Sequence, residues 1–113
     1  MLTKADDSTF GAKIEFELCD VADGFCAPEF QDALKDNVMG SSKEIFDGEE
    51  PVFIGCGGSI PFMEVMSREF PAAQFLLTGV GFSDSNAHSA NENIRLGFTA
   101  KLTSFVTLVI SKL

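Results

Sequence analysis

Apolar and polar positions alternate most clearly near the N-terminus of this chain. Between residues 12 and 18, charged side chains fall on one side of an extended chain and apolar side chains on the other. The apolar set is Ala12, Ile14, Phe16 and Leu18. A period of two is typical of a strand with one face in water. The pattern therefore predicts a strand over residues 12–18, followed by a turn-rich connector over residues 20–27.

Two further apolar runs are short and continuous rather than alternating. Residues 51–54 read Pro-Val-Phe-Ile and are followed by glycine, and residues 73–78 contain Phe75, Leu76 and Leu77. Short apolar runs bounded by turn residues are consistent with strands that are buried on both faces. Burial on both faces favours a parallel sheet. The two runs are therefore interpreted as buried strands of one sheet.

Three segments have helical spacing instead. The first begins at Pro28, ends at Gly40, and is followed by a polar, mobile loop to Glu50. Its apolar positions are Phe30, Ala33, Leu34 and Val38. The second is capped by Ser59, has Pro61 in its first turn and ends at Phe70-Pro71.

The third helix is predicted to follow a capping box at Ser89-Ala90-Asn91-Glu92, in which the serine hydroxyl and the glutamate carboxylate bind free backbone N–H groups. Its apolar stripe repeats every three or four residues, as Phe98, Leu102, Phe105, Val106, Val109 and Leu113. A stripe of this kind predicts a helix that packs on a sheet.

Strands and helices alternate in this reading, which predicts an α/β fold with a partly parallel sheet of about three strands flanked by helices. Such a thin sheet leaves strand edges and apolar helix faces uncovered. We therefore expect the chain to be the C-terminal portion of a larger α/β domain, or else to bury this surface by forming a homo-oligomer.

Composition narrows the classes of function. With 113 residues the chain makes one domain at most. Its net charge of -9 and only eight Lys and Arg residues exclude a nucleic-acid binder of the usual basic kind. No apolar run reaches the roughly 20 residues that span a bilayer, so no membrane partner is expected. An odd set of cysteines (Cys19, Cys26 and Cys56) without a signal peptide predicts reduced thiols and a cytoplasmic location.

Residues 55–59, Gly-Cys-Gly-Gly-Ser, lie between a predicted strand and a predicted helix. Backbone N–H groups at such a junction can bind a small anion. The nucleotide-binding glycine patterns do not fit, because no Lys precedes Ser59 and Ile60 stands where a glycine is required. The glycines either hold a carboxylate or only permit a tight turn, and spacing does not choose between these readings. Cys56 is interpreted as a small buried filler rather than a nucleophile.

His88 is the chain's only histidine and lies in the polar stretch Asp84-Ser85-Asn86-Ala87-His88-Ser89. Histidine is the commonest metal ligand, but a catalytic zinc needs about three protein ligands and this chain has no HExxH or CxxC. The loops after the second and third predicted strands both leave the carboxyl ends of those strands, where ligands bind in open α/β sheets. We therefore expect His88 and Ser59 to face one pocket, with His88 either a ligand or a structural residue of its loop.

These motifs together resemble one family. Residues 50–52 leading into Gly57-Gly58-Ser59-Ile60-Pro61, then residues 78–81, then residues 84–89 with Asn91-Glu92-Asn93, are similar to the C-terminal end of the catalytic domain of the carnosinase and aminoacylase family. Its members are co-catalytic zinc dipeptidases and deacylases. The resemblance covers roughly residues 10–113.

The resemblance implies that His88 is the last ligand of a pair of zinc ions, and that Gly57, Gly58 and Ser59 help to hold the substrate's carboxylate. The family's other metal ligands and its general base would precede Met1, and Glu49-Glu50 does not match the family's glutamate pair. Residues 1–19 would be the end of a lid region, residues 20–28 a hinge, and residues 28–113 the C-terminal part of the catalytic domain.

These implications predict a C-terminal fragment of a zinc-dependent amidohydrolase that cleaves a dipeptide or an N-acyl amino acid by metal-activated water. The fragment alone carries no catalytic residue and should be inactive. A different class of function is a non-catalytic interaction or oligomerisation module of the same fold. A small-anion binder that uses Gly57, Gly58 and Ser59 without metal is a third reading.

Overall fold

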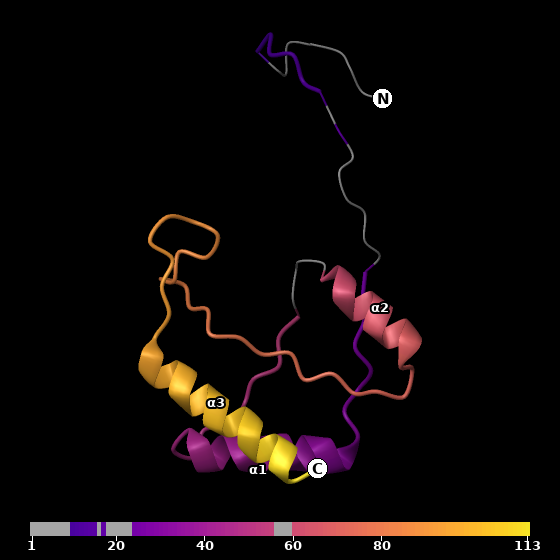
Figure 1. Cartoon of the computed structure of the whole chain (residues 1–113), viewed down its shortest axis with the longest axis vertical. Coiled ribbons are helices and arrows are strands. Elements are labelled where there is room, and N and C mark those ends of the chain that lie inside the picture. The colour runs from indigo at the N-terminus through magenta and orange to yellow at the C-terminus, as the bar shows by residue number, and fades with distance from the viewer. Residues whose placement is uncertain (1–9, 16, 18–23, 56–59) are drawn as a thin grey trace.

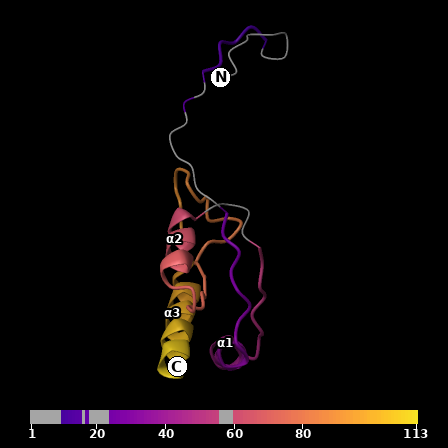
Figure 2. The same cartoon turned by 90° about the vertical axis from the view of Figure 1, so that its right-hand side faces the viewer.

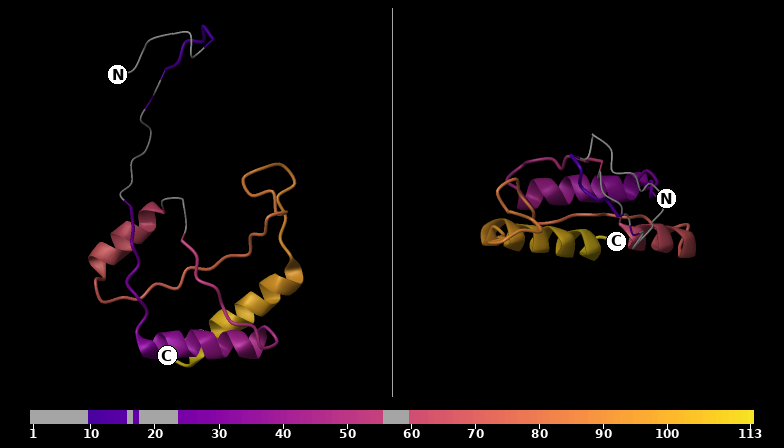
Figure 3. Two further views of the ribbon diagram at one scale, coloured as in Figure 1. Left: turned by 180° about the vertical axis from the view of Figure 1, so that it is seen from behind. Right: turned by 90° about the horizontal axis from the view of Figure 1, so that it is seen from above.

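The computed structural model describes residues 10–15, 17, 24–55 and 60–113. Within these ranges the regular elements are three helices: α1 (Asp32–Ile45), α2 (Pro61–Glu69) and α3 (Leu96–Ser111). Figure 1 shows α1 and α3 side by side, with α2 further up the molecule. Turned by 90°, α2 and α3 form one layer and α1 the other (Figure 2), and the view from above gives the same arrangement (Figure 3).

The prediction of a partly parallel sheet is wrong, because the described part of the chain contains no strand. Residues 51–55 and 73–81 are extended but lack the backbone ladder that defines a sheet. They contact the extended segment 24–31 through side chains instead. The ring of Phe53 lies 5.5 Å from that of Phe30, and Phe75 lies 5.4 Å from Phe25. An extended apolar run becomes a strand only when another strand offers it N–H and C=O groups in register.

The burial expected for the apolar run at residues 51–54 is also absent. Val52, Phe53 and Ile54 are 83%, 56% and 86% exposed. Of the first predicted strand, residues 12–15 and 17 form no ladder, while residues 16 and 18 lie outside the described residues. The proposed boundaries of the lid region, the hinge and the catalytic portion are not decided by this arrangement and stay predictions.

Helix α1 differs from its predicted position at both ends. It begins at Asp32 rather than Pro28 and passes through Gly40 to Ile45. Asp32 in the first turn and Lys43 in the last suit the helix dipole. The helix ends where Asp47 and Gly48 adopt left-handed φ values of 57° and 94°, and the Gly48 N–H binds the carbonyl of Lys43 at 2.8 Å.

The predicted polar loop after Gly40 is therefore partly helix, and two of its serines are buried. Ser41 donates to Asn37 Oδ1 and Ser42 donates to the carbonyl of Glu49, both at 3.0 Å. Asn37 in turn donates from Nδ2 to the carbonyl of Val109 in α3 at 2.9 Å. Hydroxyl groups that find such partners can be buried at little cost. A Ser-rich sequence was for this reason compatible with an inner helix face.

Helix α2 confirms its prediction: Pro61 occupies the first turn and the helix ends before Phe70-Pro71. The proposed cap, Ser59, lies outside the described residues. Most of the predicted apolar stripe of α3 faces inward, since Phe105 and Val109 are buried, but Leu113 lies past the end of the helix and is 83% exposed. The stripe packs on α1 and not on a sheet. The predicted capping box is wrong, because residues 89–91 form turns and Arg95 is the residue that precedes the first turn of α3.

The core formed in this way is small. Its buried apolar side chains are Val38, Phe105 and Val109, packed at the α1–α3 contact. The chain exposes 9285 Å², whereas a folded monomer of 12.2 kDa exposes about 6,000 Å². Its radius of gyration is 19.8 Å, compared with about 13 Å for a compact chain of this length. Much of the apolar surface is therefore uncovered.

Candidate functional site

The loop between Phe82 and Arg95 carries His88 at its exposed end. In Figure 1 it is the orange loop that projects from the N-terminal end of α3. His88 is exposed and has a left-handed φ of 60°; Asn86 and Asn91 have φ values of 51° and 59°. Asparagine and histidine are among the non-glycine residues that adopt this conformation most readily. The Asn-rich sequence therefore permits a tightly folded loop, where a helix cap was predicted.

Hydrogen bonds close the base of this loop. The Asn93 N–H donates to the carbonyl of Ser85 at 2.9 Å, and the Asn93 side-chain amide donates to the carbonyl of Asp84 at 3.2 Å. Ser85 is buried, and its hydroxyl accepts a bond from the Phe82 N–H at 2.9 Å. At the tip, the Ser89 N–H donates to the carbonyl of Asn86 at 3.0 Å. These bonds define the backbone on both sides of His88.

An ion pair and an aromatic contact meet at the same base. Arg95 Nη2 donates to Asp84 Oδ2 at 2.9 Å, and the guanidinium carbon of Arg95 lies 4.0 Å from the centre of the Phe82 ring. Phe82 packs edge to face on Phe98 of α3, with ring centres 4.9 Å apart. Arginine stacks on an aromatic face and pairs with a carboxylate at once, because its guanidinium is flat and always charged.

The Arg95 guanidinium changes the pKa of the Asp84 carboxyl. Its hydrogen bond with the Arg95 guanidinium lowers the pKa of the Asp84 carboxyl from its ordinary value of 3.8. A lowered pKa in the folded chain means that the pair stabilises the loop above the pKa of the unfolded state. That contribution is lost as the pH falls through the folded-state pKa.

We predict that the Asp84 carboxyl titrates below 3.8 in the native chain. Substitution Arg95→Gln should raise this midpoint, because it removes the guanidinium that favours the charged carboxylate. Carbon-13 NMR of the Asp side-chain carboxyls between pH 2 and 6 would measure both. Lys112→Gln, which removes a separate ion pair with Glu44, is the control and should leave the Asp84 midpoint in place. An Asp84 midpoint that is the same in native and Arg95→Gln chains would contradict the prediction.

The other predicted site residues belong to a segment outside the described residues. Gly57, Gly58 and Ser59, expected to hold the substrate's carboxylate, lie outside the described residues, as does Cys56. The expectation that Ser59 and His88 face one pocket therefore stays a prediction. Cys26 is a free, exposed thiol. The sequence reading gave no role to Phe82, Asn93 or Arg95. Of these, Arg95 had a signal in the sequence, because it is the single cation that closely follows an acidic, Asn-rich loop.

Zinc requires more donors than this loop offers. In the parts of the chain that the structure covers, no group of three or more His, Cys, Asp and Glu side chains could hold a metal ion. His88 fits a metal site as a single donor, because its imidazole is exposed at the end of a loop with a defined backbone. The described residues therefore allow the chain to contribute one ligand, and any further ligands would come from elsewhere.

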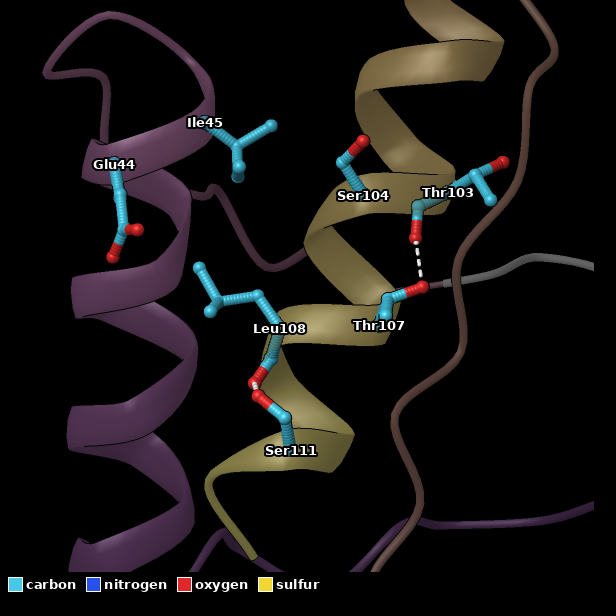
Figure 4. A pocket seen from close by; sticks show the side chains of 7 residues that line it. All are labelled: Glu44, Ile45, Thr103, Ser104, Thr107, Leu108 and Ser111. Atoms are coloured by element: carbon cyan, nitrogen blue, oxygen red, sulfur yellow. Dashed lines mark hydrogen bonds between the residues drawn. The ribbon is translucent and has the colours of Figure 1, made fainter.

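Hollows on the surface of the described residues lie away from His88. One, of about 340 Å³, is formed between α1 and α3. Figure 4 shows its hydroxyl side chains on α3 and Glu44 with Ile45 on α1. Thr103, Thr107 and Ser111 each donate to a carbonyl of their own helix, at 2.8–2.9 Å. Since their donor protons are already used, this hollow offers little to a polar ligand.

Comparison with known proteins gives one direct indication of function. The chain is 28% identical over 85 residues to a cysteinylglycine-S-conjugate dipeptidase from Corynebacterium striatum. The chain is similar to part of a dipeptidase. The match covers 75% of this chain but only 18% of that enzyme, so the chain spans less than a fifth of its relative's length. No family model matches the chain, and no solved structure matches it.

Among the residues that the structure describes, no helix has both the length and the apolar content needed to cross a bilayer.

Proposed function

We propose that this chain is the C-terminal part of a zinc-dependent dipeptidase and supplies one metal ligand, His88, to its active centre. The observation that carries the proposal is the similarity to a dipeptidase, in a chain whose single histidine is exposed at the end of a hydrogen-bonded loop. When bound, zinc polarises a scissile amide carbonyl and lowers the pKa of a bound water. The chain's own part is to hold an imidazole in a fixed direction.

The substrate class follows from the same similarity. The relative acts, by its name, on cysteinylglycine S-conjugates, so we propose a small dipeptide substrate for the complete enzyme, with N-acyl amino acids as the wider class. Gly57, Gly58 and Ser59 are proposed to bind its carboxylate through backbone N–H groups. No general base is assigned to this chain, since the sequence resemblance places that residue before Met1.

The proposal is tested by a chimera in which this chain replaces the matching segment of the Corynebacterium striatum dipeptidase. We expect hydrolysis of an S-substituted cysteinylglycine and zinc bound to the purified chimera. His88→Ala should abolish hydrolysis and reduce the bound zinc, because one ligand of the centre is lost. Lys101→Gln on α3 is the matched control and should retain both. A His88→Ala chimera as active as its parent would refute the role of His88.

The 113-residue chain is assayed beside it with added zinc or manganese. We expect no turnover of any dipeptide, since the sequence resemblance places the other metal ligands and the general base outside this chain. Turnover by the chain alone that disappears in His88→Ala would show that the chain is itself an enzyme and that the fragment reading is wrong.

A second function has an observation in its favour. Large apolar side chains of the described residues are exposed, among them Val52 (83%), Ile54 (86%) and Leu96 (77%), and uncovered apolar surface suits an interaction or oligomerisation module. Sedimentation equilibrium separates the two readings. A stable homo-oligomer with an inactive chimera would favour the module, whereas a monomer with an active chimera would favour the peptidase.

A further inference from the structure

We propose that Asp84, Arg95 and Phe82 form a clamp that positions His88, so that the loop presents the imidazole in one direction before any metal binds. The proposal rests on the proposed function, because it is zinc binding that would make a fixed imidazole useful. Asp84, Arg95 and Phe82 are assigned as positioning residues, since they act on His88 only through the loop backbone.

The clamp closes the loop from both of its ends. Asp84 lies at the start of the loop and Arg95 at its end, and their side chains meet at 2.9 Å. Between them the chain folds back on itself, with the Asn93 N–H bonded to the Ser85 carbonyl. The ion pair therefore joins the two ends of one loop. His88 lies between these ends, four residues after Asp84 and seven before Arg95.

The clamp is also connected to the core by aromatic contacts. Phe82, which carries the Arg95 guanidinium on its face, contacts Phe98. Phe98 lies 5.7 Å from Phe46, and Phe46 lies 6.0 Å from the buried Phe105. A continuous line of ring contacts thus leads from the loop base to the α1–α3 contact. Arg95 also accepts two hydrogen bonds on its carbonyl from Thr99, which fixes it to the first turn of α3.

The backbone of the loop has a conformation that requires such a constraint. His88, Asn86 and Asn91 all have left-handed φ values, and such residues persist when the surrounding structure holds them. An exposed loop with three left-handed residues would otherwise sample other conformations, because loops of this kind open easily. The hydrogen bonds of Asn93 and the ion pair between Asp84 and Arg95 at the base of the loop restrict the loop backbone. A ligand held ready in this way loses less conformational entropy when it binds a metal.

The test measures backbone order in the 113-residue chain by nitrogen-15 NMR relaxation. In the native chain the amides of residues 86–91 should have order parameters near 0.85, the value of a rigid backbone. Arg95→Gln and Asp84→Asn should lower them below about 0.6, the range of flexible segments. Arg95→Lys keeps the positive charge and should retain most of the order. Lys112→Gln, which breaks an unrelated ion pair, should change nothing.

A second readout follows the direction of the imidazole itself. A copper(II) iminodiacetate chelate binds a single exposed imidazole, and His88 is the chain's only histidine. In the native chain its paramagnetic broadening should fall on one narrow set of amides near the loop. In Arg95→Gln the broadening should spread over a wider set, because the imidazole then samples several directions, and Arg95→Lys should restore the narrow set. His88→Ala should abolish the broadening in every background.

Two results would overturn the inference: residues 86–91 of the native chain are already flexible, or Arg95→Gln and Asp84→Asn leave them as ordered as before. If Arg95→Gln unfolds the start of α3, Asp84→Asn decides, because it leaves the residue that precedes the helix unchanged. Neither readout measures hydrolysis. An inactive chimera with a loop that Arg95→Gln loosens would refute the proposed function alone, and an active chimera with an unaffected loop would refute this inference alone.

Discussion

Val38→Asp should unfold the α1–α3 pair at room temperature. Val38 is 1% exposed and lies in the cluster formed with Phe105 and Val109. Burying a carboxylate there without a partner costs several kcal/mol. A core of this size supplies no more than about 3–5 kcal/mol. The helices should therefore separate, with loss of the far-ultraviolet circular dichroism signal at 222 nm.

Ala33→Asp is the matched control, because it places the same carboxylate on an exposed position in the first turn of the same helix. A negative charge there is favourable for the helix dipole. We expect its helical signal and its urea midpoint to equal or exceed those of the native chain. If Val38→Asp and Ala33→Asp unfold at the same urea concentration, Val38 is not at the centre of the core.

Phe105→Ala should lower the free energy of unfolding by about 3–5 kcal/mol, the usual loss when a buried aromatic side chain is truncated. Phe105 is 5% exposed and its ring contacts Phe46. The truncation removes apolar contacts and leaves a cavity between α1 and α3. Because this loss is as large as the stability that the core supplies, circular dichroism without urea should show most of the α1–α3 helical signal lost, and urea should produce no cooperative transition.

Ile110→Ala controls for the change in helix α3 itself. Ile110 is 64% exposed, so its truncation should change the free energy of unfolding by no more than about 0.5 kcal/mol. Equal losses in the two variants would mean that the α3 stripe does not pack on α1.

Helix α2 and most of the apolar stripe of α3 were the parts of the fold that the sequence predicted well, and the reason is local. Pro61 and Phe70-Pro71 define the ends of α2 by backbone chemistry that needs no tertiary partner. The stripe of α3 repeats over many residues, so its inner face was clear. What the stripe packs on was not, because an apolar helix face is equally satisfied by a sheet or by another helix.

The errors have tertiary causes. Gly40 was read as a stop, but a glycine on an exposed helix face costs only about 1 kcal/mol, and the actual end depends on Asp47 and Gly48. The buried serines Ser41 and Ser42 depend on partners that periodicity cannot show. The apolar runs at residues 51–54 and 73–78 were read as strands, yet a strand requires a neighbour in register, which no single-segment pattern supplies.

For the candidate site, the sequence located the loop but not its construction. The polar stretch around His88 was correctly placed before the last helix. Its clamp joins Asp84 to Arg95 across the whole loop, and such a pairing depends on how the chain turns back. The left-handed residue Asn91 was instead taken as part of a helix start, because Ser89-Ala90-Asn91-Glu92 also matches a capping box.

The exposed apolar segment Val52-Phe53-Ile54 affects how the chain behaves at high concentration. Its extended backbone and exposed apolar side chains form a template on which an identical segment of another molecule can align, as in the early steps of fibril growth. Mutual repulsion between molecules of net charge -9 opposes that encounter. Salt screens this repulsion, with a screening length of about 10 Å at 0.1 M. We therefore expect the chain to aggregate faster as the ionic strength rises.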